Sequence, residues 1–103
     1  MIKVINGLKY DTTKATKIAK WENSYGSSDF QWCMESLYVT RSGRYFVCGR
    51  GGALSIYSEP CGNNARGEGS KIIVLTEEEA LSWCEDREID SDTISEYFTI
   101  EDA

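Results

Sequence analysis

The stretch FQWCMESLYVTRSGRYFVCG, residues 30–49, carries the strongest β-strand pattern in the chain. Two runs rich in aromatic and β-branched residues flank Arg41-Ser42-Gly43. This arrangement is typical of two antiparallel strands joined by a tight turn. The stretch therefore predicts a β-hairpin at the centre of the fold.

The register of this hairpin has two solutions, and they place the cysteines differently. A two-residue turn at Ser42-Gly43 puts Cys33 and Cys48 on one face, together with the apolar residues Leu37, Val39 and Phe46. A three-residue loop over 41–43 puts Cys33 and Cys48 on opposite faces. We favour the two-residue turn because it groups those three apolar residues.

The segments before this hairpin add a second hairpin and a helix. Asn6-Gly7, within IKVINGLKYD, readily supplies the two positive φ angles of a type I′ turn and predicts a hairpin. Candidate caps at 11–13, followed by Ala15, Ile18 and Ala19 at helical spacing, predict a helix over 13–22.

The segments after the central hairpin add a strand and two more helices. KIIVLT predicts a strand over 71–76, and Thr76 with Glu79 forms a capping box for a helix over 77–87. A further helix is expected over 91–98. The fold class is therefore α+β, an antiparallel β-sheet of hairpins with two to three helices packed on one face, in a single domain over 1–103.

Composition and charge narrow the classes of function. The chain has 103 residues, of which 41% are apolar and 12% aromatic, as in folded proteins. Its 17 acidic and 11 basic residues give a net charge of −6. Direct binding to nucleic acid depends on clustered Lys and Arg, so we expect none. An acidic surface suits a protein partner with a basic surface instead.

The sequence also bears on location. No apolar run is long enough to cross a membrane, and MIKVINGLKYD lacks the order of a signal peptide. We therefore expect a cytoplasmic protein with no membrane partner.

The four cysteines, Cys33, Cys48, Cys61 and Cys84, lie singly in a chain without histidine. Four thiolates can complete a tetrahedral structural zinc site, so Zn²⁺ held by these residues is one interpretation. No Cys-x-x-Cys pair marks them as ligands, and free cysteine also packs as a small buried hydrophobe. A disulfide ranks third among the interpretations, because disulfides seldom persist in the cytoplasm.

The glycine-rich segment GRGGALS, residues 49–55, lacks the Lys-Ser/Thr ending of a phosphate-binding loop. It predicts a bulge at the end of a strand. A catalytic cysteine requires a neighbouring base, and the chain has no histidine to supply one, so we expect no enzyme activity. Tyr38, Tyr45 and Tyr57 are candidates for an interface, where tyrosine is enriched.

Three segments together carry a family resemblance: ESLYVTRSGRYFVCGRGGALSIYSEPCG at 35–62, IIVLTEEEALSWCEDREID at 72–90 and TISEYF at 93–98. Nearly the whole chain resembles a family of small, mostly uncharacterised proteins carried by phages and other mobile elements of bacteria. Some proteins of this size and setting are anti-CRISPR proteins that block type II Cas9, and the chain is similar to a metal-containing one.

The resemblance implies a zinc-stabilised inhibitor that binds Cas9 stoichiometrically in the bacterial host and prevents guide or target nucleic acid from loading. An acidic face would then occupy a basic Cas9 surface, and its residues would be Glu77, Glu78, Glu79, Glu85 and Asp86. Two alternatives stay open. One is a small zinc-stabilised module that binds another protein and has no CRISPR role, and the other is a housekeeping adaptor or toxin partner.

Overall fold

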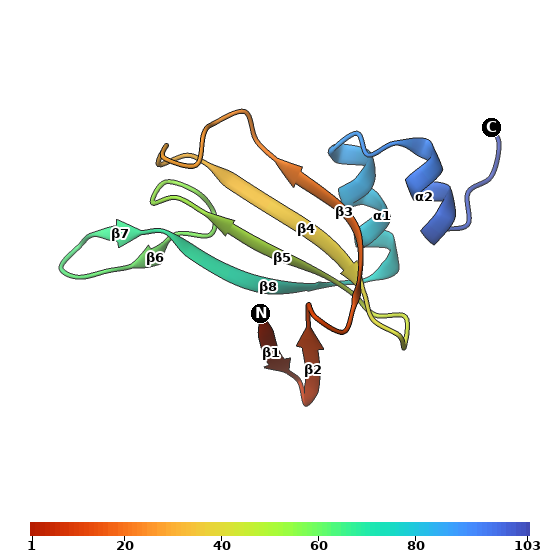
Figure 1. Ribbon diagram of the computed structural model, residues 1–103, viewed down its shortest axis with the longest axis horizontal. Helices are drawn as coiled ribbons and strands as arrows, with labels where there is room; N and C mark the ends of the chain where they lie inside the picture. The colour runs from red at the N-terminus through yellow and green to blue at the C-terminus, as the bar shows by residue number, and fades with distance from the viewer.

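The computed structural model describes residues 1–103 and has the predicted α+β architecture (Figure 1). Its elements are β1 (Ile2–Ile5), β2 (Leu8–Asp11), β3 (Thr16–Glu22), β4 (Cys33–Val39), β5 (Tyr45–Gly51), β6 (Glu59–Pro60), β7 (Arg66–Gly67), β8 (Gly69–Leu75), α1 (Glu77–Asp86) and α2 (Ser91–Tyr97). Neither helix is long and apolar enough to cross a lipid bilayer.

The main sheet is an antiparallel meander in the order β3-β4-β5-β8. The ribbon shows α1 and α2 together at one end of this sheet and the short β6–β7 hairpin at the other end (Figure 1). The β1–β2 hairpin forms a separate two-stranded sheet. Both helices pack on the face of the sheet that carries Leu37 and Val47, which we call the helix face, and we call the opposite face the open face.

The central hairpin is present, but its register is the one that we did not favour. Val39 pairs with Tyr45 and Leu37 with Val47, so Arg41-Ser42-Gly43 form a three-residue loop. Gly43 has a φ of +84°, the left-handed conformation that ends such loops. The choice of the two-residue turn was therefore wrong. Leu37 and Val39 pack in the core on one face and Phe46 in the core on the other, so grouping these three residues on one face was not the right criterion.

The helix predicted over 13–22 is also wrong, because this segment contains the edge strand β3. The Asp11 carboxylate accepts hydrogen bonds from the Thr13 amide and hydroxyl, which forms a single turn and no helix. A shift in the β3–β4 register between Lys17 and Ala19 then lets Ile18 and Ala19 both pack against the main core. Two adjacent residues packed against that core imitate the apolar spacing of a helix.

The β1–β2 hairpin, β8, α1 and α2 match their predictions, whereas the short strands β6 and β7 lie in a segment that we expected to be a loop. Asn6 and Gly7 have φ angles of 51° and 76°, as the hairpin between β1 and β2 requires. Thr76 caps α1, and the reciprocal hydrogen bonds with Glu79 make the expected capping box. Asp90 caps α2 by accepting a hydrogen bond from the Thr93 amide. The turn and the two helix caps depend on interactions between residues close in sequence, so they could be predicted from the sequence.

Each face of the sheet has its own hydrophobic core. On the helix face, Leu37 and Val47 pack with Trp83 and Cys84 of α1 and with Phe98 just after α2. On the open face, a smaller core is formed by Tyr10, Phe46 and Ile72. The β1–β2 hairpin thus covers one part of the open face and leaves the rest accessible.

The glycine-rich stretch makes room for Tyr57, which is completely buried. A β-carbon at Gly49 would lie 2.0 Å from the Tyr57 ring, so only glycine lets the ring cross β5 at this point. Tyr45 is buried too, at 9% exposure, and stacks on Phe98. Assigning Tyr45 and Tyr57 to an interface was therefore wrong, and Tyr38 alone of the three stays partly exposed.

We expect Gly49→Ala to lower the free energy of unfolding by about 1–3 kcal/mol or more, because the added methyl group overpacks the site against the Tyr57 ring. Chemical denaturation of the purified protein measures the change. Gly26→Ala is the matched control, because a β-carbon at Gly26 would meet nothing within 4 Å. Equal stability of the two variants would contradict this account of Gly49.

Candidate functional site

The most elaborate polar site is a buried carboxylate, Glu35, at the centre of β4. Its side chain is only 5% exposed. One oxygen, Oε1, accepts hydrogen bonds from Trp83 Nε1 at 3.0 Å and from Arg87 Nε at 2.7 Å. The other oxygen, Oε2, accepts a short hydrogen bond from the Tyr57 hydroxyl. We call these four residues the Glu35 cluster.

Two tryptophan rings hold the guanidinium of Arg87. Its central carbon lies 5.0 Å from the centre of the Trp21 ring and 4.9 Å from that of Trp83. A guanidinium at this distance from an aromatic face is attracted by the ring quadrupole. Since Trp21 belongs to β3, Trp83 to α1 and Glu35 to β4, the arginine links two strands to the helix.

The arrangement favours a structural role for the Glu35 cluster. Burial, and then the hydrogen bond to Glu35, raise the pKa of Tyr57, so its phenol stays neutral and donates. No buried side-chain nitrogen or oxygen lacks a hydrogen-bond partner. The cluster therefore attaches α1 and the loop carrying Tyr57 to one point of the sheet.

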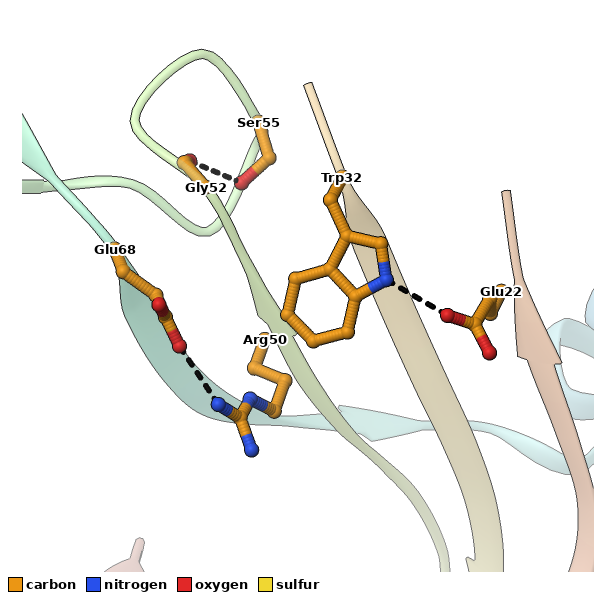
Figure 2. Close-up of polar contacts among 6 residues, drawn as sticks. All are labelled: Glu22, Trp32, Arg50, Gly52, Ser55 and Glu68. Atoms are coloured by element: carbon orange, nitrogen blue, oxygen red, sulfur yellow. Dashed lines mark hydrogen bonds and ion pairs between the residues drawn. The ribbon is translucent and has the colours of Figure 1, made fainter. Parts of the chain in front are cut away.

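The largest hollow of the surface is a groove of ≈ 660 Å³ on the open face. Its wall includes Arg50, which pairs with Glu68 at 2.7 Å and lies over the Trp32 ring at 5.3 Å (Figure 2). Trp32 in turn donates its indole N–H to Glu22 at 2.8 Å. The groove thus combines charges of both signs with an aromatic residue beneath Arg50.

The four cysteines lie in four different environments. Cys33 is buried at the start of β4, and Cys84 is completely buried in α1. Cys48 lies on the opposite face of the sheet from Cys33, with its sulfur 3.5 Å from that of Met1. Cys61 is exposed, and no two of the four form a disulfide. The predicted shared face of Cys33 and Cys48 was therefore wrong.

No group of three or more His, Cys, Asp or Glu side chains lies close enough together to hold a metal ion. The zinc site of Cys33, Cys48, Cys61 and Cys84 stays a prediction, and elemental analysis of the untagged protein tests it. Burial raises the pKa of the thiols of Cys33, Cys48 and Cys84, which favours the neutral thiol over the metal-binding thiolate.

The acidic face predicted on α1 is exposed. All five of its residues are accessible, namely Glu77, Glu78, Glu79, Glu85 and Asp86. Glu79 also accepts a hydrogen bond from the Thr76 amide, so part of its side chain serves the helix cap. Ala80, Trp83 and Cys84 occupy the opposite side of α1 and pack on the sheet. The helix therefore presents acidic side chains to solvent in both its first and its last turn.

Sequence reasoning missed how strongly the charges are segregated. Residues 77–102 contain eleven acidic residues and one basic residue, a net charge of −10. Residues 1–76 contain six acidic and ten basic residues, a net charge of +4. A separate count of the charges before and after residue 76 was the available signal, because the helices follow the last strand of the sheet.

Comparison with models of known protein families, with curated proteins and with solved structures gives no match. The function therefore has to be argued from the residues themselves.

We expect Glu35→Ala to reduce the free energy of unfolding by about 3–5 kcal/mol, since it leaves Arg87 without its buried partner. Glu68→Ala is the control, because Glu68 also pairs with an arginine but in an exposed pair, with side chains 51% and 54% accessible. Removing the exposed pair costs about 0–1 kcal/mol. Similar losses in urea denaturation of the two variants would argue against the structural role of Glu35.

We expect the four thiols to react with a disulfide reagent at very different rates. Cys61 should react fast in the native protein, whereas Cys84, at 0% exposure and with a raised pKa, should react only after unfolding. Absorbance of the released thiolate gives the rates. Cys61→Ser should remove the fast phase, and a fast phase that survives this change would contradict the assignment.

Proposed function

We propose that the protein acts by binding, and that the acidic surface of its two helices engages a basic surface of a partner protein. The segregation of charge carries this proposal. α2 adds the exposed acids Asp92 and Glu96 to those of α1, and Arg87 is the one basic residue of this region. Its charge is already paired with Glu35.

The acidic surface is also rigid. The capping box fixes the first turn of α1, and the Glu35 cluster fixes the last turn through Trp83 and Arg87. Because the helix backbone is already fixed, binding need not order it, and the entropy lost is that of the side chains. Its field also accelerates encounter with an oppositely charged partner.

The resemblance to phage and mobile-element proteins directs the choice of partner. A bacterial nuclease that holds nucleic acid in a basic channel offers a suitable surface, and type II Cas9 is the one that the resemblance implies. Bound stoichiometrically, the acidic surface would compete with guide or target nucleic acid for that channel. Under this proposal the chain is an anti-CRISPR protein and has no catalytic function.

A second mode of protein binding is favoured by an apolar group at the other end of the sheet. Phe30, Leu54 and Ile56 are 67%, 68% and 70% exposed. The Leu54 amide donates to the Phe30 carbonyl at 2.8 Å, which holds the two loops together. Exposed apolar groups of this kind mark contact sites on proteins. A module with another partner and no CRISPR role could bind through them.

We expect Glu78→Lys/Glu85→Lys to weaken binding to Cas9 by at least about tenfold and to flatten its salt dependence, because attraction becomes repulsion at the interface. Co-purification of the two proteins followed by titration at low and moderate salt measures both effects.

Glu59→Lys/Glu68→Lys is the matched control, since it changes the net charge equally at a site away from the helices. Unchanged binding by the helix variant, together with loss of binding by Phe30→Ser/Leu54→Ser, would move the interface to the apolar loops. Failure of the unaltered protein to bind Cas9 would refute the proposed partner.

A further inference from the structure

The basic residues of the sheet region are almost all without acidic partners. Of the eleven basic residues in the chain, only Arg50 and Arg87 form ion pairs. Unpaired lysines and arginines gather around β2, β3 and the β4–β5 loop, namely Lys9, Lys14, Lys17, Lys20 and Arg41. Like charges repel, so this gathering has an electrostatic cost, which the carboxylate of Asp11 offsets in part through Lys9 and Lys14.

Three of these cations converge on one cavity. Lys9, Lys14 and Arg41 line a hollow of ≈ 470 Å³, together with the hydroxyl residues Thr40 and Ser42. The one carboxylate there belongs to Asp11, and it already accepts hydrogen bonds from the Thr13 amide and hydroxyl. The lowered pKa of Asp11 keeps its carboxylate ionised, so the cavity holds three cationic groups against one carboxylate, a net charge of +2. With its hydroxyl-rich wall, it can bind an anion.

The positive charge continues from this cavity along the edge strand. Lys17 pairs in register with Tyr38, and its ammonium lies 5.8 Å from the centre of the tyrosine ring on the open face. Lys20 pairs with Ser36, which lines the groove of the same face. At the rise of a β-strand, the two lysines are about 10 Å apart. Cations in a row fit a linear polyanion better than a compact one.

The acidic helices do not cancel this field. They pack on the other face of the sheet, and mobile ions screen exposed charges beyond about 8–10 Å at physiological salt. The net charge of −6 is therefore a poor guide to what the open face attracts. This separation removes the composition argument against nucleic acid, which assumed mixed charges.

We propose that the cavity of Lys9, Lys14 and Arg41, extended by Lys17 and Lys20, binds the phosphate backbone of a single-stranded nucleic acid. A single strand is flexible enough to place one phosphate in the cavity and the next ones along β3. The contacts are to phosphate alone, so binding is independent of sequence. The site does not depend on the acidic helices or on the function proposed for them.

Fluorescence anisotropy with a labelled oligothymidylate of about twelve nucleotides tests the proposal. We expect saturable binding whose Kd rises about twenty- to fiftyfold between about 50 and 200 mM salt, as three or four phosphate contacts predict. Lys9→Gln/Arg41→Gln should weaken binding at low salt by at least about tenfold and should make the salt dependence less steep.

Arg66→Gln/Lys71→Gln is the matched control, because it removes the same net charge outside the cavity and should leave Kd within about twofold. Thermal melting of both variants confirms that they fold. Equal weakening by the control would show unspecific attraction and overturn the proposal. Absence of oligonucleotide binding at low salt would also overturn the proposal. This holds even if calorimetry shows that pyrophosphate binds in the cavity.

Discussion

A buried negative charge organises this molecule. Removing the carboxylate of Glu35 from water is costly, and it is tolerated only because three donors from different parts of the chain reach it. Those donors can meet the carboxylate only when α1, the loop carrying Tyr57 and β4 adopt their native arrangement. The hydrophobic contacts favour compactness in general, whereas Glu35 selects this particular packing of helix on sheet.

The three-residue hairpin loop sets the strand register that the Glu35 cluster requires. With Arg41-Ser42-Gly43 in the loop, Glu35 pairs with Gly49, and the empty side of that glycine holds the Tyr57 ring. A two-residue turn would instead set Arg50 opposite Glu35 and bring Cys48 to the helix face. The hairpin loop, Gly49 and the buried phenol of Tyr57 therefore depend on one another.

Local signals in the sequence predicted much of the fold. Asn6-Gly7 and the Thr76–Glu79 capping box act within a few residues, so they can be recognised without tertiary information. β3 could not be predicted in this way, because its irregular pairing with β4 decides which side chains face the core. For the site, the acids of α1 followed from helix periodicity. The Glu35 cluster and the cationic cavity join residues far apart in the chain, so no local sequence pattern predicts them.

The separation of charge between the two layers makes the molecule an electric dipole. Its negative pole lies over α1 and α2, and its positive pole lies over β3 and the N-terminal hairpin. In the field of a highly charged surface such a body experiences a torque and rotates before it touches. A basic surface is therefore approached with the helices in front, and an acidic one with the sheet in front. The orientation during the approach thus follows from the sequence order, in which the strands carry the net positive charge and the helices after them carry the net negative charge.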